Sequence, residues 1–451
     1  MFGDETVPSP SRRWDRLLDS VRTHDWIVPA VMVAAATALA FTMDALDQVV
    51  QGRLEPVWWL FSGEQKTARQ LLSAIAAAMV AVVTMAFSVT VTALTLVAQH
   101  YGTQVIRTFM RNLTTQVVIG AFPATFVYAL MILRSVHNAS NDESLPRIAI
   151  TVGILLALAS FGLLLYFLYH VSESLDAPNV VASVAHDLER VIERTTRRTD
   201  GRPVSEPAEA PGTAAERARV IEAATSGYLQ TIDCAELVAT AQRHDAIIRL
   251  QCRIGRFVLR GDRLATVDGA GAARLPAGCV HNALSLGAKR TLEQDVEFGI
   301  DQLVQVAIRG LSPGRNDTFT TMLCLDRLGA ALSLLADRRF PPSVLRDGDG
   351  RPRLVMHPPT FAELVDRAFE QIHSFGGETT VVAIRLLRTL KAIALRAQRP
   401  GDRAALRRHA VQVHEASRQQ LGERLGIEAI EAEFRETMAA LEEDHRRSAA
   451  A

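Results

Sequence analysis

The sequence lacks the features that identify the common enzyme, metal-binding and nucleic-acid-binding classes. Its 49 basic side chains are balanced by 49 acidic ones, so no positive excess is available for nucleic acid. Only four of its 451 residues are cysteine, none in a CxxC pair, and its 12 histidines are scattered. The GxxxxGKS/T, GxGxxG, HExxH and GxSxG motifs are absent. We therefore expect no metal ion, no cofactor, no nucleic-acid partner and no enzymatic activity.

Charge is also missing from most of the first half of the chain. Residues 26–170 contain only 13 of the charged side chains. The stretches without any Asp, Glu, Lys or Arg are Trp26–Met43, Gln70–Ile106, Asn112–Leu133 and Ile148–Ser172. Because roughly 20 helical residues cross a hydrocarbon core about 30 Å thick, each stretch predicts a membrane-spanning helix. A cleavable signal peptide is an alternative for the first stretch alone, and the other three would still hold the protein in the bilayer.

Lys and Arg residues near the ends of the spans predict the orientation of the chain. The N-terminal tail has four arginines and the loop between spans two and three has two, whereas the two opposing loops, of which the first is predicted at Asp44–Arg69, together have five Lys or Arg. This count favours the cytoplasm for both termini. It also places the long C-terminal region in the cytoplasm, where four scattered cysteines fit a reducing compartment.

After the fourth stretch the pattern changes from apolar spans to an amphipathic chain. Residues 180–192 repeat apolar side chains at helical spacing, which predicts a stalk helix, and the prolines, glycines and small residues that follow predict a flexible linker. We expect a mainly α membrane protein with four transmembrane helices, followed by a cytoplasmic α+β domain that is mostly helical. Its predicted parts are the N-terminal tail 1–25, the transmembrane domain 26–172, the stalk helix and linker 173–225, a small α+β module 226–280 and a helical domain 281–451.

Local patterns distinguish the last two parts. Alternating apolar residues predict a strand at Ile248–Ile254 and a hairpin at Phe257–Val267. Asp233 with Glu236 three residues later predicts the start of a short helix, and Thr360 with Glu363 is the same kind of capping-box pair at the start of a later one. Beyond Val280 the apolar spacing is helical almost to the end. The helices predicted there are Thr291–Leu311, Asp317–Ala336, Thr360–His373, Thr380–Gln398, Asp402–Leu421 and Glu428–Arg447.

A polar segment joins the first two of these helices. Its polar residues, with two acidic ones at the start of the preceding helix, are Glu293, Asp295, Ser312, Arg315, Asn316 and Asp317. Acidic residues stabilise the positive end of a helix dipole and Asn316 or Asp317 can cap the next helix, so a structural joint is the simpler interpretation. The alternative is a binding loop, because a helix N-terminus beside Ser312 and Arg315 can hold an anion.

Several motifs along the chain resemble those of a known bacterial family. They are Phe87–Thr90 with Leu94–Gln99, Phe126–Leu130, Arg290–Asp295 with Phe298-Gly299, and Leu311–Gly314 with Asn316-Asp317. On these motifs the chain, over most of Leu71 to about Gln398, resembles the domain-of-unknown-function family 2254, whose members are predicted membrane proteins. It departs from the family after span two, where Gly102-Thr103-Gln104 replaces Pro-Arg. The resemblance implies a protein of the bacterial inner membrane and supplies no established activity.

The second span has a polar face. At 100° per residue, ten small or polar residues fall within roughly a quarter of the helix circumference. They are Lys66, Gln70, Ser73, Ala77, Ala81, Thr84, Ser88, Thr92, Thr95 and Gln99. The members that form the candidate pore or helix-packing face are Ser73, Thr84, Ser88, Thr92, Thr95 and Gln99. Small and hydroxyl residues allow close helix packing in lipid, whereas a polar face can also line a water-filled path.

The sequence therefore supports two functions of different classes. The first is an oligomeric, channel-like or transport-associated protein of the inner membrane, in which the second span lines a path for an ion or small ligand and the cytoplasmic domain regulates it. The second is a non-conducting membrane scaffold or sensor whose cytoplasmic domain binds a partner. The partners we expect are the lipid bilayer and further copies of the same chain.

Overall fold

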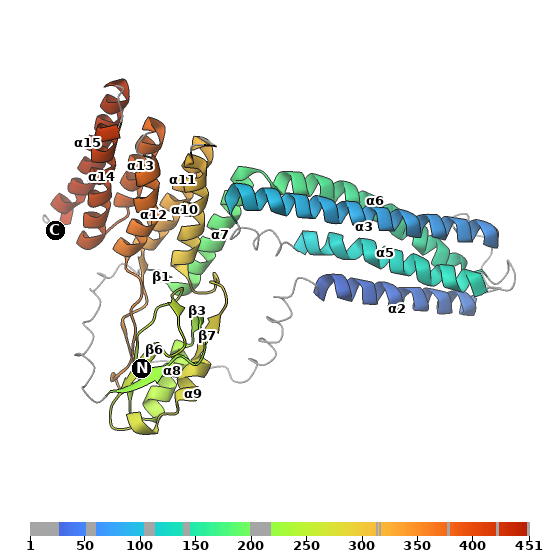
Figure 1. The fold of residues 1–451 in the computed structure, drawn as a ribbon, viewed down its shortest axis with the longest axis horizontal. Coiled ribbons are helices and arrows are strands. Elements are labelled where there is room, and N and C mark those ends of the chain that lie inside the picture. The colour runs from blue at the N-terminus through green and yellow to red at the C-terminus, as the bar shows by residue number, and fades with distance from the viewer. Residues whose placement is uncertain are drawn as a thin grey trace. The chain divides into compact units, whose positions relative to one another are not determined.

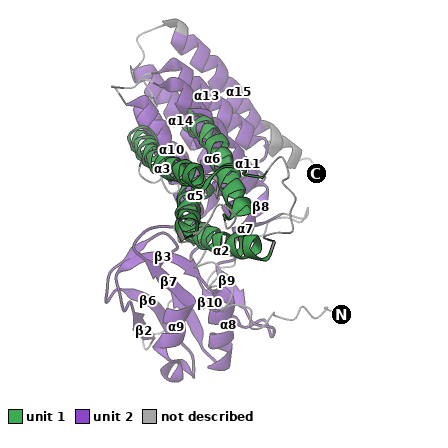
Figure 2. Cartoon of the chain, turned by 90° about the vertical axis from the view of Figure 1, so that its right-hand side faces the viewer, with its two compact units in different colours: residues 1–176 green, residues 177–451 purple. Residues whose placement is uncertain are grey.

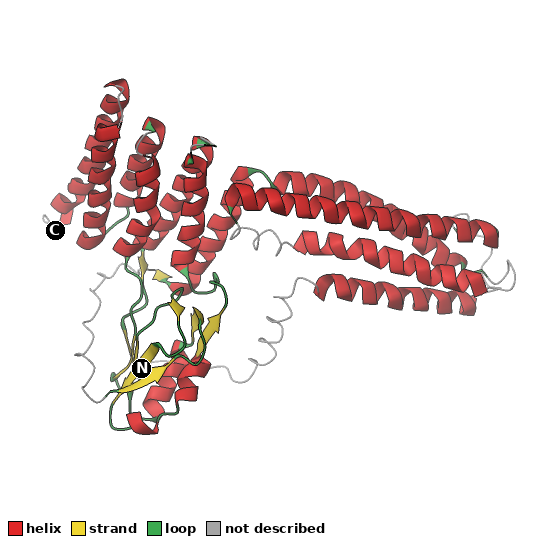
Figure 3. Ribbon diagram, viewed as in Figure 1, coloured by secondary structure: helices red, strands yellow, loops and turns green. Residues whose placement is uncertain are grey.

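The structure is a computed structural model of the 451-residue chain. It describes residues 27–50, 60–102, 113–138, 145–198, 218–312, 314, 317–376, 379–420 and 424–448. The chain forms two compact units, residues 1–176 and residues 177–451, which are green and purple in Figure 2. The described part of the first unit is helical, and the second unit combines helices with strands (Figure 3).

The first unit is a bundle of long apolar helices. They are α2 (Ile27–Val50), α3 (Gln65–Tyr101), α5 (Leu113–Asn138) and α6 (Arg147–Ser174). Of these, α5 contacts each of the other three and lies between α2 and α3 (Figure 1). Each of the four uncharged stretches is therefore confirmed as a helix over its described residues.

Two helices of this unit extend further than a single span requires. α2 continues past Met43 to Val50, so Asp44 and Asp47 lie within the helix rather than in the loop that we expected there. α3 is one continuous helix of 37 residues. At about 1.5 Å per residue it is about 55 Å long, well beyond a hydrocarbon core of about 30 Å. It ends at Gly102, whose φ of 101° is a conformation that favours glycine.

The second unit contains a bundle of helices. They are α7 (Ala177–Thr195), α10 (Val296–Leu311), α11 (Thr318–Ala336), α12 (Phe361–Gly376), α13 (Thr380–Ala394), α14 (Pro400–Gln420) and α15 (Arg424–Ser448). Within it α10 packs against α11 and α12, while α13 packs against α11, α14 and α15. The six helices predicted beyond Val280 are all present, with ends that differ by only a few residues.

The helix that follows the membrane spans is part of this bundle. α7 packs along both α10 and α11. At Gly299 of α10 a Cβ atom would come within 2.8 Å of Leu188 Cδ1, so a larger residue here would force Leu188 to move. The apolar side of α7, which includes Val181, Leu188 and Ile192, is buried. The amphipathic helix that we predicted as a stalk thus also forms one face of the helical core.

The α+β module contains two sheets. The five-stranded sheet has the order β2 (Arg219–Glu222), β6 (Arg263–Asp268), β4 (Ile247–Leu250), β10 (Pro352–Val355) and β9 (Val344–Arg346). The three-stranded sheet has the order β5 (Phe257–Val258), β3 (Gly227–Ile232) and β7 (Leu284–Gly287). The module also includes helices α8 (Cys234–Arg243) and α9 (Ala277–Ala283). Leu229, Leu237, Ile248 and Leu264 belong to one buried cluster that joins these elements.

Two expectations for this region are corrected by the structure. Phe257–Val267 is not one hairpin, because β5 pairs with β3 while β6 pairs with β2 and β4, so its strands belong to different sheets. In addition β7, β9 and β10 lie within residues 281–451, which we expected to form a helical domain, and β10 pairs in parallel with β4. A separate pair, β1 (Arg197–Arg198) with β8 (Arg338–Arg339), also joins distant segments. Local periodicity does not reveal pairings between residues so far apart in sequence.

One helix of the second unit resembles a membrane span in composition. Five described helices are long and apolar enough to cross a bilayer, and the fifth is α11. Its apolar window is 56% buried inside the protein, against 6% to 44% for the four helices of the first unit. α11 packs against α7, α10 and α13, which explains this burial. A hydrophobic core helix therefore satisfies the same length and composition criteria as a span.

Candidate functional site

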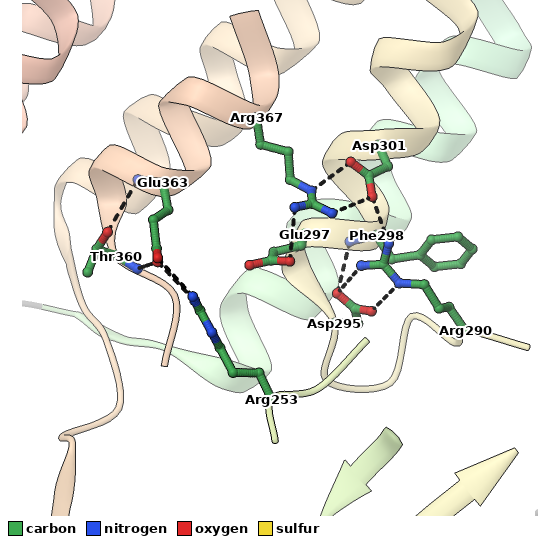
Figure 4. A network of polar contacts seen from close by, with 9 residues as sticks. All are labelled: Arg253, Arg290, Asp295, Glu297, Phe298, Asp301, Thr360, Glu363 and Arg367. Carbon is green, nitrogen blue, oxygen red and sulfur yellow. Dashed lines mark hydrogen bonds and ion pairs between the residues drawn. The ribbon is translucent and has the colours of Figure 1, made fainter. Parts of the chain in front are cut away.

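A network of ion pairs connects the α+β module to the helical bundle (Figure 4). Arg290 lies between β7 and α10 and donates from Nε and Nη2 to the two carboxylate oxygens of Asp295, at 2.8 and 2.9 Å. Its Nη1 also donates to Asp301 at 2.7 Å. Asp295 accepts from the Phe298 backbone N–H at 2.9 Å and so caps α10. This one carboxylate therefore fixes both the start of the helix and the arginine beside it.

A second arginine completes the network from the neighbouring helix. Arg367 of α12 donates to both oxygens of Asp301, at 2.7 and 3.1 Å, and lies 3.2 Å from Glu297. Burial by itself lowers the pKa of Arg290, but its hydrogen bonds to Asp295 and Asp301 outweigh this effect and raise the pKa above its ordinary value. The pKa of Arg367 is raised in the same way by Asp301 and Glu297, so both guanidinium groups stay charged beside three carboxylates.

A third contact between the same parts surrounds the start of α12. Arg253, which follows β4, donates to both carboxylate oxygens of Glu363 at 3.0 and 2.8 Å. Glu363 also accepts from the Thr360 backbone N–H, while Thr360 Oγ1 accepts from the Glu363 N–H, at 2.8 and 3.2 Å. The capping box predicted at these two residues is thus confirmed. It has an additional role that the sequence did not indicate, because its glutamate binds an arginine 110 residues away.

The other half of the predicted polar joint lies between α10 and α11. Asp317 accepts from the Thr320 backbone N–H at 3.0 Å and from Thr320 Oγ1 at 2.6 Å, and so caps α11. Its own N–H donates to the Gly310 carbonyl at 2.8 Å, and Ser312 Oγ donates to the Arg309 carbonyl at 2.7 Å. Arg315 and Asn316 lie outside the described residues.

The predicted joint residues are not brought together into one place. Glu293 and Asp295 precede the first turn of α10, whereas Ser312 and Asp317 follow its last turn. The 16 residues of this helix separate the two groups by about 24 Å. Asp295 is buried in the ion-pair network, and Glu293 is exposed. Asp295 and Asp317 cap helices at two separate joints, and Asp295 is also an ion-pair partner of Arg290.

The polar face predicted on span two has a different environment. All ten of its residues, from Lys66 to Gln99, are exposed in the described chain. The side of α3 that faces α5 and α6 is instead buried and consists mainly of alanine and larger apolar residues such as Leu72, Met79 and Val97. We call the exposed polar side, at the ten positions given above, the α3 stripe. None of the helices that the structure describes covers it.

The hydroxyl groups of the α3 stripe bond to their own helix. The hydroxyls of Thr84, Thr92 and Thr95 each donate to the carbonyl oxygen four residues earlier, at 2.9, 2.9 and 2.8 Å. Their hydrogen-bond donors are therefore satisfied without another helix, which lowers the cost of placing them in an apolar setting. The oxygen lone pairs remain available to accept a bond from water or from a neighbouring chain.

The exposed side of α6 has the composition expected of a surface that faces lipid. It presents large apolar and aromatic side chains, which are between 50% and 67% exposed. They are Leu155, Leu158, Phe161, Leu165, Tyr166 and Tyr169. Large apolar residues are the usual contact surface for lipid tails, and tyrosines suit the headgroup boundary. The α3 stripe, which is small and hydroxyl-rich over a similar length, lacks this character.

The sequence interpretation missed two carboxylates at one end of the first unit. Asp47 of α2 accepts from the backbone N–H groups of Ile148 and Ala149 at 3.0 and 2.8 Å, so it caps α6 from another helix. Asp44, one turn earlier, accepts from Ser135 of α5. Their spacing of three residues at the end of an apolar stretch was the available signal, since it places both on one helix face. These contacts tie three helices together at the same end.

No group of three His, Cys, Asp or Glu side chains in the described part of the chain is arranged to hold a metal ion. The four cysteines are free, and burial raises the pKa of the Cys252 thiol to about 11, which disfavours the reactive thiolate. The geometry thus defines a multi-pass membrane protein whose polar side chains form structural joints in the second unit and an exposed stripe in the first.

Comparison with known proteins agrees with this class. A family model described as "Predicted membrane protein (DUF2254)" matches residues 22–392, so the chain belongs to this family and the resemblance found in the sequence is confirmed. The chain is 29% identical to "Uncharacterized protein Rv1290c" of Mycobacterium tuberculosis (strain ATCC 25618 / H37Rv) over 427 residues, which cover 93% of this chain and 81% of that protein. "Uncharacterized protein Mb1321c" of Mycobacterium bovis (strain ATCC BAA-935 / AF2122/97) is similar to the same extent. No solved structure matches the chain.

Proposed function

We propose that this protein is an oligomeric channel-like or transport-associated protein of the inner membrane. In this proposal the four helices of the first unit are the spans, both termini are cytoplasmic, and copies of α3 surround a path for an ion or small solute. The second unit regulates or assembles the pore from the cytoplasm. The observation that supports the proposal is the exposure of all ten positions of the α3 stripe.

The stability of such a surface depends on what surrounds it. A small, hydroxyl-rich helix face gains little from contact with lipid tails, and in membrane proteins such faces turn toward cavities or toward other helices. Since α5 and α6 pack on the opposite side of α3, water or a second copy is a better neighbour for the stripe than lipid tails. A ring of chains with the stripe toward its axis provides both.

A non-conducting scaffold or sensor is the second candidate. The bonds of Thr84, Thr92 and Thr95 to their own helix favour it, because a helix face with satisfied donors can pack directly against a second copy without water. In that case the stripe is a dimer or oligomer interface, and the second unit binds the functional partner. The two candidates therefore differ in whether the α3 stripe faces water or packs against another chain.

Substitution of Ser88, in the middle of the α3 stripe, separates these candidates. If the stripe lines water, Ser88→Leu should leave the elution volume of the assembly unchanged and suppress ion flux from liposomes through a hydrophobic constriction. Ser88→Asp should then be tolerated and should favour cations. If the stripe is packed, both substitutions should disassemble the oligomer, with an overpacking cost of about 1 to 3 kcal/mol for leucine. The absence of flux from well-folded native protein, together with disassembly of both variants, would refute the channel.

α6 offers a matched control. Ala159 is also an exposed small residue of a membrane helix, but it lies beside Leu158 on the large apolar face. Ala159→Leu should change neither the elution volume nor the flux, because leucine resembles the residues around it. Ala81→Leu starts from the same residue type within the stripe and should reproduce the effect of Ser88→Leu. Equal effects at positions 81 and 159 would show that any bulk added to a membrane helix is harmful, and would remove the support that the stripe gives to either candidate.

The orientation is tested separately by thiol labelling in a variant without the native cysteines. Ser62→Cys lies just before α3 and should react with an impermeant maleimide on intact cells. Asp349→Cys, in an exposed turn between β9 and β10, should react only after lysis. The reverse pattern would place the second unit outside the cytoplasm and invert the proposed topology.

A further inference from the structure

The loop between β5 and β6 presents a surface that neither candidate function explains. We call residues 256–263 the β5–β6 tip. Phe257 and Leu259 are 53% and 57% exposed, although Val258 between them is buried. Because alternate residues of an extended chain point to opposite sides, the two exposed apolar side chains point away from the core on the same side. The Phe257 ring meets the Tyr228 ring edge to face at 4.9 Å, which holds it in an outward position.

The same loop carries an excess of positive charge. Arg256, Arg260 and Arg263 are exposed, and within the part of the chain that the structure describes their guanidinium groups form no hydrogen bond or ion pair. Glu222 lies opposite Arg263 in the β2–β6 ladder but forms no ion pair with it. Asp262 is the one acidic residue of the tip, against three arginines, and one of its carboxylate oxygens accepts from the Leu259 backbone N–H at 2.8 Å. Positive charge and apolar side chains therefore face outward together.

The backbone of the β5–β6 tip is satisfied from within the module. The N–H of Arg260 donates to Ser226 Oγ at 2.9 Å, and that of Gly261 donates to the Ala223 carbonyl at 2.9 Å. The N–H of Asp262 donates to the Leu259 carbonyl at 3.0 Å. Gly261 adopts a φ of 89°, which permits this tight turn. A loop whose donors are already bonded loses little when it leaves water, and its shape is fixed before any partner arrives.

We propose that the β5–β6 tip binds the anionic surface of a lipid bilayer, with Phe257 and Leu259 in the headgroup layer and the three arginines on lipid phosphates. Basic residues next to exposed Phe and Leu are the composition of interfacial membrane-binding surfaces. The helices of the first unit anchor the same chain in a membrane, which raises the effective concentration of lipid around the second unit. The proposal does not depend on whether the protein conducts ions.

Photocrosslinking of the full chain in nanodiscs tests this contact while the native cysteines are kept. A benzophenone amino acid replaces Leu259 in one version and Ala270 in another. Ala270 is exposed in a different turn of the same module and is the positional control. After illumination, intact mass reports lipid adducts in phosphatidylglycerol nanodiscs and in phosphatidylcholine nanodiscs. We expect adducts at position 259 in the anionic lipid, a loss of about tenfold in the neutral lipid, and no adducts at position 270.

Charge substitutions test the role of the arginines. The triple variant Arg256→Gln, Arg260→Gln and Arg263→Gln should reduce the adduct at position 259 by about tenfold, as should high salt. The matched control removes three exposed arginines elsewhere in the second unit, through Arg274→Gln, Arg407→Gln and Arg418→Gln, and should leave the adduct unchanged. Unchanged elution volumes and melting temperatures show that each variant is folded.

Several outcomes would overturn the proposal. The absence of adducts at position 259 in anionic nanodiscs would show that the tip does not reach lipid. Equal adducts at positions 259 and 270 in both lipids would indicate general proximity without recognition by the tip. A mass that corresponds to two protein chains would assign the surface to a second copy. Loss of the adduct in inorganic phosphate, but not in chloride of equal ionic strength, would indicate a site for free phosphate.

Discussion

The ion-pair network around Arg290 and the α3 stripe are both polar, but their side chains are used in opposite ways. In the network each carboxylate of Asp295 and Asp301 contacts an arginine from the same chain, and Asp295 also caps a helix. In the stripe the side chains are exposed, and the threonine hydroxyls bond only to their own helix. The first arrangement is complete within one chain, whereas the second has a surface left for a neighbour.

The α3 stripe is therefore the polar region that is more suited to a function beyond folding. A buried carboxylate that already binds an arginine and a backbone N–H has few lone pairs left for a ligand. Its loss should therefore affect folding before it affects any activity. For the α3 stripe we expect the reverse, an effect on activity before folding. Side chains that are exposed in the monomer contribute little to the stability of the monomer.

The largest effect should follow from Asp295→Ala. This substitution removes the cap of α10 and leaves the half-buried guanidinium of Arg290 without its bidentate partner. We expect the free energy of unfolding of the second unit to fall by about 3 to 5 kcal/mol. Calorimetry of the full chain in detergent measures the change. Glu293→Ala removes an exposed carboxylate nearby and should cost less than about 0.5 kcal/mol. Equal costs would mean that the network is not a stabilising joint.

A smaller effect is expected from Asp47→Asn in the first unit. The amide retains one acceptor oxygen, so one of the two bonds to the Ile148 and Ala149 N–H groups is lost. We expect a cost of about 1 to 2 kcal/mol, measured as a lower melting temperature in detergent. Gln48→Ala, on the exposed side of the same helix, is the control. If Asp47→Asn left the melting temperature unchanged but altered flux, the first unit would contain a carboxylate that acts in function and not in folding.

The joint between α10 and α11 should respond more weakly. Asp317→Ala removes two hydrogen bonds to Thr320 at an exposed helix start. We expect about 1 kcal/mol of destabilisation of the second unit by the same calorimetric measurement. Thr320→Val, which removes only the hydroxyl bond and keeps the backbone cap, should cost less. Full stability of Asp317→Ala with loss of flux in liposomes would instead indicate a binding loop at this joint.

The last effect depends on pH and concerns a carboxylate that is an exception within the second unit. Asp402 is buried, lies 3.6 Å from Arg399 and has one oxygen without a hydrogen-bond partner. Burial raises the pKa of Asp402 from 3.8 to about 6, although Arg399 opposes this. The folded state therefore binds the proton more tightly than the unfolded state, so this group destabilises the fold as pH rises from about 4 to 6.

Asp402→Asn should remove this pH-dependent penalty. At pH 7 we expect the variant to be more stable than the native chain by about 3 kcal/mol, the free energy of a pKa that is higher by about two, whereas near pH 3 the two should be equally stable. Melting temperatures of both proteins across this range measure the difference. A native chain that gains stability relative to the variant as pH rises would show that Arg399 fully compensates the buried charge.

Much of the local structure could be predicted from neighbouring residues. The apolar stretches set the four long helices, and the spacing of apolar residues located the helices α10 to α15 to within a few residues. Caps such as Asp317 and the Thr360 with Glu363 box were also visible. These signals act within one helical turn, so a short window of sequence contains them completely.

The tertiary structure decided which distant residues meet. The partners of Asp301 include Arg367, 66 residues away, and β10 pairs with a strand more than 100 residues earlier. No local pattern distinguishes these partners from other arginines or other short apolar segments. Asp44 and Asp47 were predicted in a loop for the same reason. Their hydrogen bonds are made to α5 and α6, and no local pattern shows that these helices lie beside them.

The α3 stripe shows this division most directly. Sequence periodicity determined that one side of the second span is small and polar, because helix geometry alone sets which residues share a face. Whether this side is covered depends on which face of α3 packs against α5 and α6, and the tertiary structure places the opposite, apolar face there. The burial of large apolar residues between helices decides that orientation, and it leaves the polar side exposed on the outside of the chain.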